Sequence, residues 1–284
     1  IAGPKNIFGL ICRILAPVLS IWLMVSYATG LAIPGSRTRE LADEVGYVPR
    51  LWNVMDDAQQ AGATTTFLSL TNVKAMDEEP GYNEQAMKAI AQRYEQAATR
   101  INQERASTLT DNTVIMVLSE SFSDPNRVPG VHFNTDPMPF IRSLGDVTTA
   151  GLMLSPGYGG GTANMEYMGL TGLSMANFDS SLTSPYQQLL PGACWAPSVN
   201  QMWGAPEHSI GLHPYEPSMY SRETNYKKLG FSHFYALKGD DIIAHQDKID
   251  DSPYVSDEAT YQSTVEEIKK TDDNQFLQVI TMQN

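Results

Sequence analysis

Hydrophobic residues fill one long stretch near the start of the chain. From Ile7 to Ile33 the only charged residue is Arg13, and residues 14–33 contain no charge. A helix needs about 20 apolar residues to cross a bilayer, so we expect residues 1–35 to form a transmembrane helix. A cleavable or uncleaved signal peptide is the alternative, because Lys5 and Arg13 supply a basic end before the apolar run.

The pattern becomes polar and helical after residue 35. Leu41–Gln60 favours one helix, and Glu84–Gln103 favours another, in which Met87 and Ile90 are spaced for one face. We therefore expect residues 36–110 to form a helical linker with a solvated, charged face and no catalytic signature.

Short apolar runs alternate with helical stretches from residue 111 onward. Thr113–Leu118 is a continuous apolar run, typical of a strand buried on both faces of a parallel sheet. The other predicted elements are strands at Ser209–Leu212, Phe231–Tyr235 and Phe276–Met282, and helices at Asn225–Leu229 and 257–270. This alternation predicts an α/β domain with a central, mostly parallel sheet over residues 111–284.

Composition narrows the class of partner. The 284 residues are 42% hydrophobic, which is ample for a core, and they carry a formal net charge of -13. Such an acidic chain does not suit a nucleic-acid surface; a cation or metal-bearing partner fits better. Cys12 and Cys194 form neither a disulfide framework nor a zinc motif. Because the chain starts on Ile1 rather than methionine, we expect a preceding segment.

A glycine-rich turn is the strongest candidate for chemistry. Gly159–Gly161 leave the backbone free and unobstructed beside an anion, and Thr162 follows at the start of an apolar, helical stretch. Thr162 is either a helix cap or a nucleophile, and the pattern leaves both open. The reciprocal capping box is missing because Met165 stands where Glu or Gln is required. No Gly-Lys-Ser/Thr follows, which excludes a nucleotide-binding phosphate loop.

A second candidate is the carboxylate that follows the first predicted core strand. In open α/β sheets, ligands lie beyond the carboxyl ends of the strands, which places Glu120 at such a site by position. Its alternative is a carboxylate that merely ends a strand. A divalent cation between Glu120 and Thr162 would ease deprotonation of the hydroxyl and suit phosphoryl transfer.

The strand predicted at Ser209–Leu212 is followed by further polar candidates. His213 and Arg222 are suited to bind a phosphate or hydroxyl, with Tyr220 stacking or hydrogen bonding beside them. A structural role is the alternative for each. The remaining histidines show no metal-ligand spacing and are expected to be structural or on the surface: His132, His208, His233 and His245.

Taken in chain order, these motifs resemble the lipoteichoic acid synthase family, membrane phosphoglycerol transferases of the alkaline phosphatase and sulfatase superfamily. The ordered set is specific, although no single motif is. Besides the candidates above it comprises Phe67–Leu70, Pro80–Tyr82, Leu118–Phe122, Gly161–Ala163, Lys228–Phe231 and Thr281–Asn284.

The resemblance implies roles for individual residues. Glu120 becomes a metal ligand, and Thr162 both a metal ligand and the covalent nucleophile. His213 and Arg222 match positions that bind glycerophosphate. The substrate-binding set also takes in Gly161 of the turn and Tyr220, which falls where relatives often carry tryptophan.

The resemblance also implies cofactors and partners. They are a Mn²⁺ or Mg²⁺ ion, phosphatidylglycerol as donor, and a lipid-linked glycan or teichoic acid as acceptor. The protein is expected in the cell membrane, with a single or last transmembrane helix and an extracytoplasmic catalytic domain. The family's next histidine and its Asp-His pair would follow Asn284, so we expect the chain as it stands to be inactive.

Alternative functions remain open from the residues. A phosphoethanolamine transferase of the same superfamily also uses threonine. A sulfatase-type hydrolase is disfavoured, because Cys194–Ser198 lacks the C/S-x-P-x-R spacing. An inactive extracytoplasmic binding module is a third possibility, of a different class.

Overall fold

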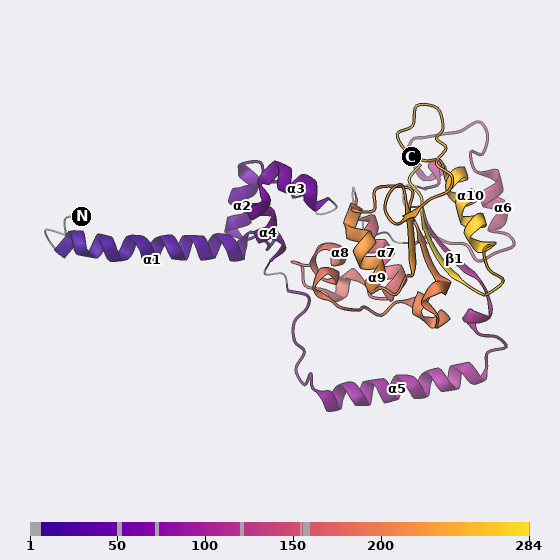
Figure 1. The fold of residues 1–284 in the computed structure, drawn as a ribbon, viewed down its shortest axis with the longest axis horizontal. Helices are drawn as coiled ribbons and strands as arrows, with labels where there is room; N and C mark the ends of the chain where they lie inside the picture. The colour runs from indigo at the N-terminus through magenta and orange to yellow at the C-terminus, as the bar shows by residue number, and fades with distance from the viewer. Residues whose placement is uncertain are drawn as a thin grey trace. The chain divides into compact units, whose positions relative to one another are not determined.

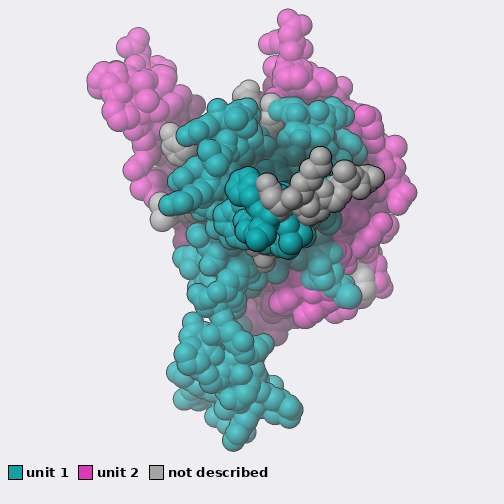
Figure 2. Space-filling model, turned by 90° about the vertical axis from the view of Figure 1, so that its left-hand side faces the viewer, with its two compact units in different colours: residues 1–105, 173–194, 218–221 teal, residues 106–172, 195–217, 222–284 magenta. Residues whose placement is uncertain are grey.

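The structure is a computed structural model that describes residues 7–49, 53–71, 74–119, 122–153, 155 and 160–283. Figure 1 traces the chain and Figure 2 colours its two compact units. The first unit contains residues 1–105, 173–194 and 218–221, and the second contains residues 106–172, 195–217 and 222–284.

The first unit begins with the apolar helix α1 (Ile7–Gly30), which has 24 residues and no buried side chain. Its length and composition are sufficient to cross a membrane. Gly30 is the last residue of this helix, and Thr38 packs closely against it. A Cβ at Gly30 would lie only 2.7 Å from the Thr38 hydroxyl oxygen, so this approach requires glycine. The same hydroxyl donates to the Ser26 carbonyl at 3.2 Å and ties the next helix to the end of α1.

The single helix predicted for Leu41–Gln60 is wrong. Gly46 takes a positive φ of 89°, which ends the first helix, and Asn53 caps a new one by accepting a hydrogen bond from the Met55 amide at 3.2 Å. Two short helices replace it, α2 (Arg37–Glu44) and α3 (Val54–Ala61), and α4 (Ala63–Leu70) follows them.

Helix α5 (Glu84–Gln103) has the predicted bounds. It begins there because the Asn83 side chain accepts a hydrogen bond from the Ala86 amide at 2.9 Å. A later segment of the chain belongs to the same unit, since the Asp179 amide donates to the Ala75 carbonyl at 2.9 Å. The elements of this segment, residues 173–194, are η3 (Met175–Asn177), α8 (Pro185–Gln188) and η4 (Leu190–Gly192). Residues 218–221 also belong to the unit and contain η7 (Met219–Ser221).

The second unit contains a five-stranded sheet in the order β1-β5-β2-β3-β4, and every pairing is parallel. This confirms the predicted central sheet. The strands are β1 (Val114–Leu118), β2 (Ser209–Leu212), β3 (His233–Ala236), β4 (Asp241–Ile242) and β5 (Phe276–Ile280). β3 starts later than predicted, because the Phe231 amide still bonds the Tyr226 carbonyl at 3.0 Å and closes the preceding helix.

Helices cover both faces of this sheet (Figure 1). α10 (Asp257–Ile268) packs its Ile268 against the core of Ile210, Leu212, Leu277 and Val279. On the other face lie α7 (Thr162–Thr171) and α9 (Arg222–Lys228). The remaining elements are η1 (Leu109–Asp111), η2 (Pro125–Arg127), α6 (Pro139–Leu144), η5 (Val199–Trp203) and η6 (Pro206–His208).

A glycine decides how closely α9 approaches the sheet. A Cβ at Gly211 of β2 would lie 2.3 Å from the Tyr226 ring, so only glycine leaves room for that ring. Phe231 and Phe234 each lie with ring centroids 4.5 Å from Tyr226. The aromatic cluster fixes α9, and with it Arg222, against the sheet.

Candidate functional site

The carboxyl ends of three neighbouring strands meet at one edge of the sheet. Ser119 follows β1, Thr281 follows β5, and their hydroxyl oxygens lie 3.1 Å apart. His213 follows β2, and its Nδ1 lies 3.4 Å from the Ile280 carbonyl oxygen. This is the edge at which parallel α/β sheets bind ligands.

Glu120 and Gly159 lie outside the described residues. The hydrogen bond from the Thr281 amide to the Leu118 carbonyl, at 3.1 Å, fixes the chain just before Glu120. The role of Glu120 as a metal ligand stays a prediction.

Thr162 is the first residue of α7 rather than its cap. The cap position belongs to Gly161, with φ 90° and ψ 23°, and it supplies no side-chain hydrogen bond. Gly160 also has a positive φ, of 139°, so the turn uses the conformations that favour glycine. Thr162 is half-buried at the positive end of the helix dipole. The cap hypothesis is therefore wrong, and the nucleophile hypothesis stays a prediction.

Glu166 is a buried residue that the sequence patterns did not single out. It lies one turn after Thr162 on α7, and it is 1% exposed. Arg222 donates to its Oε2 through Nε at 3.0 Å and through Nη2 at 2.9 Å. Tyr226 donates to its Oε1 at 2.6 Å. The available signal was an acidic residue inside an otherwise apolar helix, which requires a partner when buried.

This network sets the environment of Arg222, a predicted phosphate ligand. Arg222 is 1% exposed, and its charge is balanced by Glu166. Burial, and after it the Glu166 carboxylate, raises the pKa of Tyr226 well above its ordinary value, so the phenol stays a donor. Glu166 therefore links the helix that begins with Thr162 to the helix that begins with Arg222.

His213 is buried at the end of β2. Burial first, and then the positive charge of Arg222, lowers the pKa of His213 well below its ordinary value. If Nδ1 carries the proton and donates to Ile280, Nε2 is an acceptor. Nε2 is buried without a hydrogen-bond partner among the described residues. An acceptor of this kind suits a hydroxyl group better than a phosphate oxygen.

The backbone is strained just before Arg222. Tyr220 and Ser221 have φ values of 56° and 53°, in the left-handed region that non-glycine residues rarely adopt. Tyr220 is buried. Strain of this kind costs about 1–3 kcal/mol per residue and is concentrated at functional sites. The roles of Tyr220, Arg222, His213 and Gly161 in binding substrate stay predictions.

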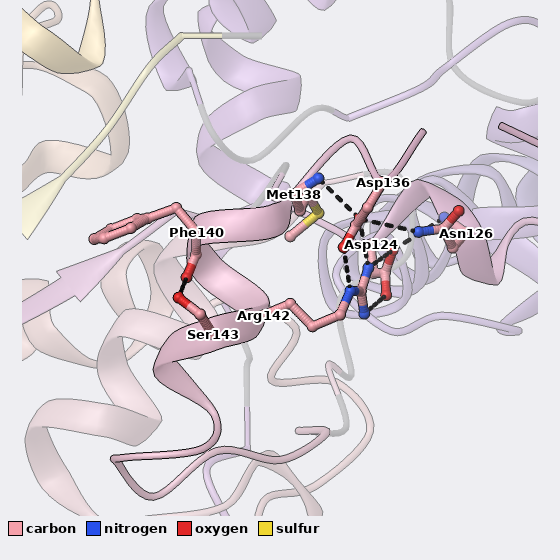
Figure 3. A network of polar contacts seen from close by, with 7 residues as sticks. All are labelled: Asp124, Asn126, Asp136, Met138, Phe140, Arg142 and Ser143. Carbon is pink, nitrogen blue, oxygen red and sulfur yellow. Dashed lines mark hydrogen bonds and ion pairs between the residues drawn. The ribbon is translucent and has the colours of Figure 1, made fainter. Parts of the chain in front are cut away.

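A charged network organises the chain that leaves β1 (Figure 3). Arg142 donates to Asp136 through Nε at 2.7 Å and to Asp124 through Nη1 at 3.0 Å. The Met138 amide also donates to Asp136, at 3.0 Å. The bonds from Arg142, followed by that from Met138, lower the pKa of Asp136 to about 2. The network closes the segment that follows the Glu120 position.

The described side chains bear on where a metal ion could bind. Within the described ranges, no group of three or more His, Cys, Asp and Glu side chains gathers closely enough to hold a metal ion. Of the two predicted ligands, these ranges include Thr162 and leave out Glu120. The described donors thus do not form a metal centre by themselves.

Comparisons with known proteins agree with the fold. Residues 112–284 match the sulfatase family. A putative cyclic beta-1,2-glucan modification protein of Rhizobium meliloti (strain 1021) is 30% identical over 247 residues, which are 86% of this chain and 35% of that protein. This chain therefore spans about a third of the length of that relative.

Two solved structures are also similar. The phosphoglycerol transferase GacH of Streptococcus pyogenes, in complex with sn-glycerol-1-phosphate, is 37% identical with a TM-score of 0.67, covering 74% of this chain and 54% of its own. The lipoteichoic acid synthase LtaP of Listeria monocytogenes is 27% identical with a TM-score of 0.34, covering 43% and 28%. A phosphoglycerol transferase is among the similar proteins, as the resemblance predicted. Because the sulfatase family model matches more than half of this chain, the chain belongs to the sulfatase family.

Proposed function

We propose that the protein is a membrane-anchored phosphoglycerol transferase with Thr162 as its covalent nucleophile. The observation that carries this is the place of Thr162, as the first residue of α7 directly after a glycine of positive φ. A hydroxyl there lies where helix amides favour an anion. The 37% identity to a phosphoglycerol transferase, solved with sn-glycerol-1-phosphate, supports the substrate class.

The proposed reaction has two displacements. Thr162 Oγ1 attacks the phosphorus of phosphatidylglycerol, the bond from phosphorus to the diacylglycerol oxygen breaks, and diacylglycerol leaves with a proton. An acceptor hydroxyl then attacks the same phosphorus, the bond from phosphorus to Thr162 Oγ1 breaks, and the acceptor's proton restores the threonine hydroxyl. Glycerophosphate is thereby moved to the acceptor without net hydrolysis.

The described residues support binding of the glycerophosphate group. Arg222 is proposed to bind the phosphate from the start of α9, where Glu166 holds its guanidinium. The neutral His213 offers Nε2 to a glycerol hydroxyl. Gly161, which adds no side chain before Thr162, and Tyr220 are proposed to line the glycerophosphate.

Members of the superfamily are metal-dependent, and we include a divalent cation in the proposal. Glu120 and Thr162 would hold Mn²⁺ or Mg²⁺, and the bound ion would lower the pKa of the threonine hydroxyl. Removing divalent cations with a chelator should therefore abolish transfer, and adding Mn²⁺ should restore it.

The apolar helix α1 supports a location in the membrane, and a relative of the chain supports the class of acceptor. α1 is the proposed anchor in the cell membrane, single or last in the protein, with the catalytic unit extracytoplasmic. The Rhizobium relative is named for modification of a glucan, which supports a cell-envelope glycan or teichoic acid as acceptor.

A threonine comparison on one helix tests the proposal. Thr162→Ala in the full-length protein should lower glycerophosphate transfer by at least about 10³-fold, and the adduct on Thr162 should disappear from the mass spectrum. Thr171→Ala, at the other end of α7, should leave transfer nearly unchanged, because its hydroxyl donates to the Tyr167 carbonyl within the same helix. Substantial activity in Thr162→Ala would remove the nucleophile assignment.

The identity of the transferred headgroup distinguishes a phosphoglycerol transferase from the alternative functions. Phosphatidylglycerol and phosphatidylethanolamine, each labelled in the headgroup, should give labelled acceptor only from the first. Ethanolamine transfer alone would favour the phosphoethanolamine transferase. Release of free headgroup alone would favour a hydrolase, and binding without either reaction would favour an inactive module.

A further inference from the structure

A row of three aromatic rings begins at His213. The ring centroids of His213 and Tyr215 lie 6.2 Å apart, and those of Tyr215 and Tyr254 lie 6.1 Å apart. Both separations are within the range of favourable aromatic pairs. His213 is 1% exposed, whereas both tyrosines are half-buried. The row therefore leads from the buried histidine to rings that solvent reaches.

Two different loops hold the tyrosines at the ligand-binding edge of the sheet. Tyr215 lies just after β2, and its carbonyl accepts a hydrogen bond from the amide of Leu237, just after β3, at 3.1 Å. Tyr254 lies just before α10. The amide of Asp257, the first residue of that helix, donates to the side chain of Gln283, after β5, at 2.8 Å. Both loops are thus tied to chain that follows neighbouring parallel strands, where α/β sheets bind ligands.

The two side chains suit a sugar ring. A half-buried tyrosine presents an apolar ring face together with a polar hydroxyl. A hexose has the matching pattern, because one face of its ring carries C–H groups and its rim carries hydroxyls. Stacking the two faces removes apolar surface from water, while the sugar hydroxyls keep their hydrogen bonds. Tyr215 and Tyr254 offer two such rings side by side.

Charge around the rings favours a neutral ligand. Tyr254 lies in segment 247–254, which carries three exposed aspartates and one lysine: Asp247, Asp250, Asp251 and Lys248. Glu216 follows Tyr215 directly and forms an ion pair with Lys238 at 2.7 Å. An acceptor with a phosphate in every unit would meet negative charge on this segment, whereas a neutral saccharide is not repelled.

We propose that Tyr215 and Tyr254 bind a neutral hexose of the acceptor glycan by stacking against its ring. A sugar held there lies at the same edge of the sheet as His213, where the glycerophosphate group is proposed to bind. The inference rests on the proposed function, because that function supplies the need for an acceptor. It adds the residues that hold the acceptor and its chemical class, a neutral saccharide rather than a polymer of glycerophosphate.

Binding is measured first, without a donor lipid, so that no turnover is required. The full-length protein in detergent micelles is titrated in a calorimeter with a neutral β-linked glucose oligosaccharide and, separately, with a glycerophosphate oligomer. The oligosaccharide should bind more tightly. No binding of the oligosaccharide, or tighter binding of the glycerophosphate oligomer, would overturn the proposal.

Substitutions test the two rings. Tyr254→Leu and Tyr215→Leu should each weaken oligosaccharide binding at least about fivefold, because leucine lacks the flat ring face. Tyr254→Phe keeps that face and should stay within about twofold of the wild-type protein. Tyr261→Leu is the control, since Tyr261 is 42% exposed on α10 and outside the row. Equal affinities of Tyr254→Leu and Tyr261→Leu would overturn the proposal, and Tyr254→Leu alone decides if Tyr215→Leu fails to fold.

Transfer kinetics then distinguish acceptor binding from chemistry. With labelled phosphatidylglycerol as donor, Tyr254→Leu should raise the KM for the oligosaccharide at least about fivefold. The kcat and the KM for the donor should stay nearly unchanged, because the ring touches neither the donor nor the nucleophile. A lower kcat with an unchanged KM for the oligosaccharide would overturn the assignment.

Thr162→Ala separates this inference from the proposed function. This variant should bind the oligosaccharide like the wild-type protein. Binding that depends on Tyr254, in a wild-type protein that transfers no glycerophosphate, would refute the proposed function alone. Transfer that depends on Thr162, with unchanged oligosaccharide affinity in Tyr254→Leu, would refute the sugar site alone.

Discussion

Arg222 donates two hydrogen bonds to one oxygen of Glu166, at 3.0 Å and 2.9 Å, and both side chains are 1% exposed. The pair joins α7 to α9, which are far apart in the sequence. Its geometry keeps the positive charge of Arg222 close to the helix that begins with Thr162. A buried pair of this kind is sensitive to the loss of either partner, because the remaining charge cannot be hydrated.

Glu166→Gln should therefore destabilise the protein strongly. It leaves the Arg222 charge buried without its counter-ion, at a cost of about 3–5 kcal/mol in unfolding free energy. Urea denaturation followed by tryptophan fluorescence measures this. The matched control is Glu216→Gln, which breaks the exposed pair with Lys238 and should cost less than about 1 kcal/mol. Equal losses in both variants would contradict the buried role of Glu166.

Gly211→Ala should disturb the same network from the sheet side. The new Cβ would lie 2.3 Å from the Tyr226 ring, which in turn bonds Glu166. Overpacking of this kind costs about 1–3 kcal/mol. Gly151→Ala is the control, because its Cβ would meet no atom within 4 Å. A Gly211→Ala protein as stable as this control would show that the ring moves aside freely.

The buried His213 should make stability depend on pH. Its pKa in the folded state lies well below the ordinary value, whereas the unfolded chain takes up the proton near pH 6.5. The unfolded state then binds more protons below that pH, so stability is full above it and falls as the pH drops, by up to about 1.4 kcal/mol per pH unit.

His213→Gln should remove this part of the slope. Denaturation midpoints measured between pH 5 and pH 8 compare the two proteins, and their curves should differ most at the acidic end. Parallel curves would mean that His213 is protonated in the folded protein or does not influence the transition.

Arg142→Gln should loosen the segment after β1 with little effect on the core. Arg142 is exposed, so salt and water screen its interactions with Asp124 and Asp136. The Met138 amide, which donates to Asp136, should exchange its hydrogen faster. Hydrogen exchange by mass spectrometry measures this, with Arg127→Gln as the control outside the network.

The same substitution should change how Asp136 titrates. Its pKa of about 2 depends first on the hydrogen bonds from Arg142. The ionised Asp136 therefore stabilises the segment at any pH above the ordinary carboxyl pKa, and this contribution is lost as the pH falls through about 2. Without Arg142 the pKa should rise toward about 3.9. An unchanged pKa, measured by carboxyl NMR, would assign the shift to the backbone instead.

The sequence alone determined the elements whose signals are local. The apolar run at α1, the periodic helix α5, and the apolar strands β1, β2 and β5 were all predicted to within a few residues. These features depend on neighbouring residues, for which periodicity and capping are sufficient guides. The break in Leu41–Gln60 was missed because Gly46 was not read as a helix end.

Only the tertiary structure decided the surroundings of the candidate site. Glu166 and Arg222 are 56 residues apart, and His213 and Ile280 are 67 apart, so no local pattern could pair them. The sequence placed Thr162 where a glycine turn enters a helix and His213 at the end of a strand. The fold made Gly161 the cap, and burial lowered the pKa of His213. The physical reason is that burial and charge pairing depend on which segments meet in space, while periodicity along the chain reports only which face of each segment is apolar.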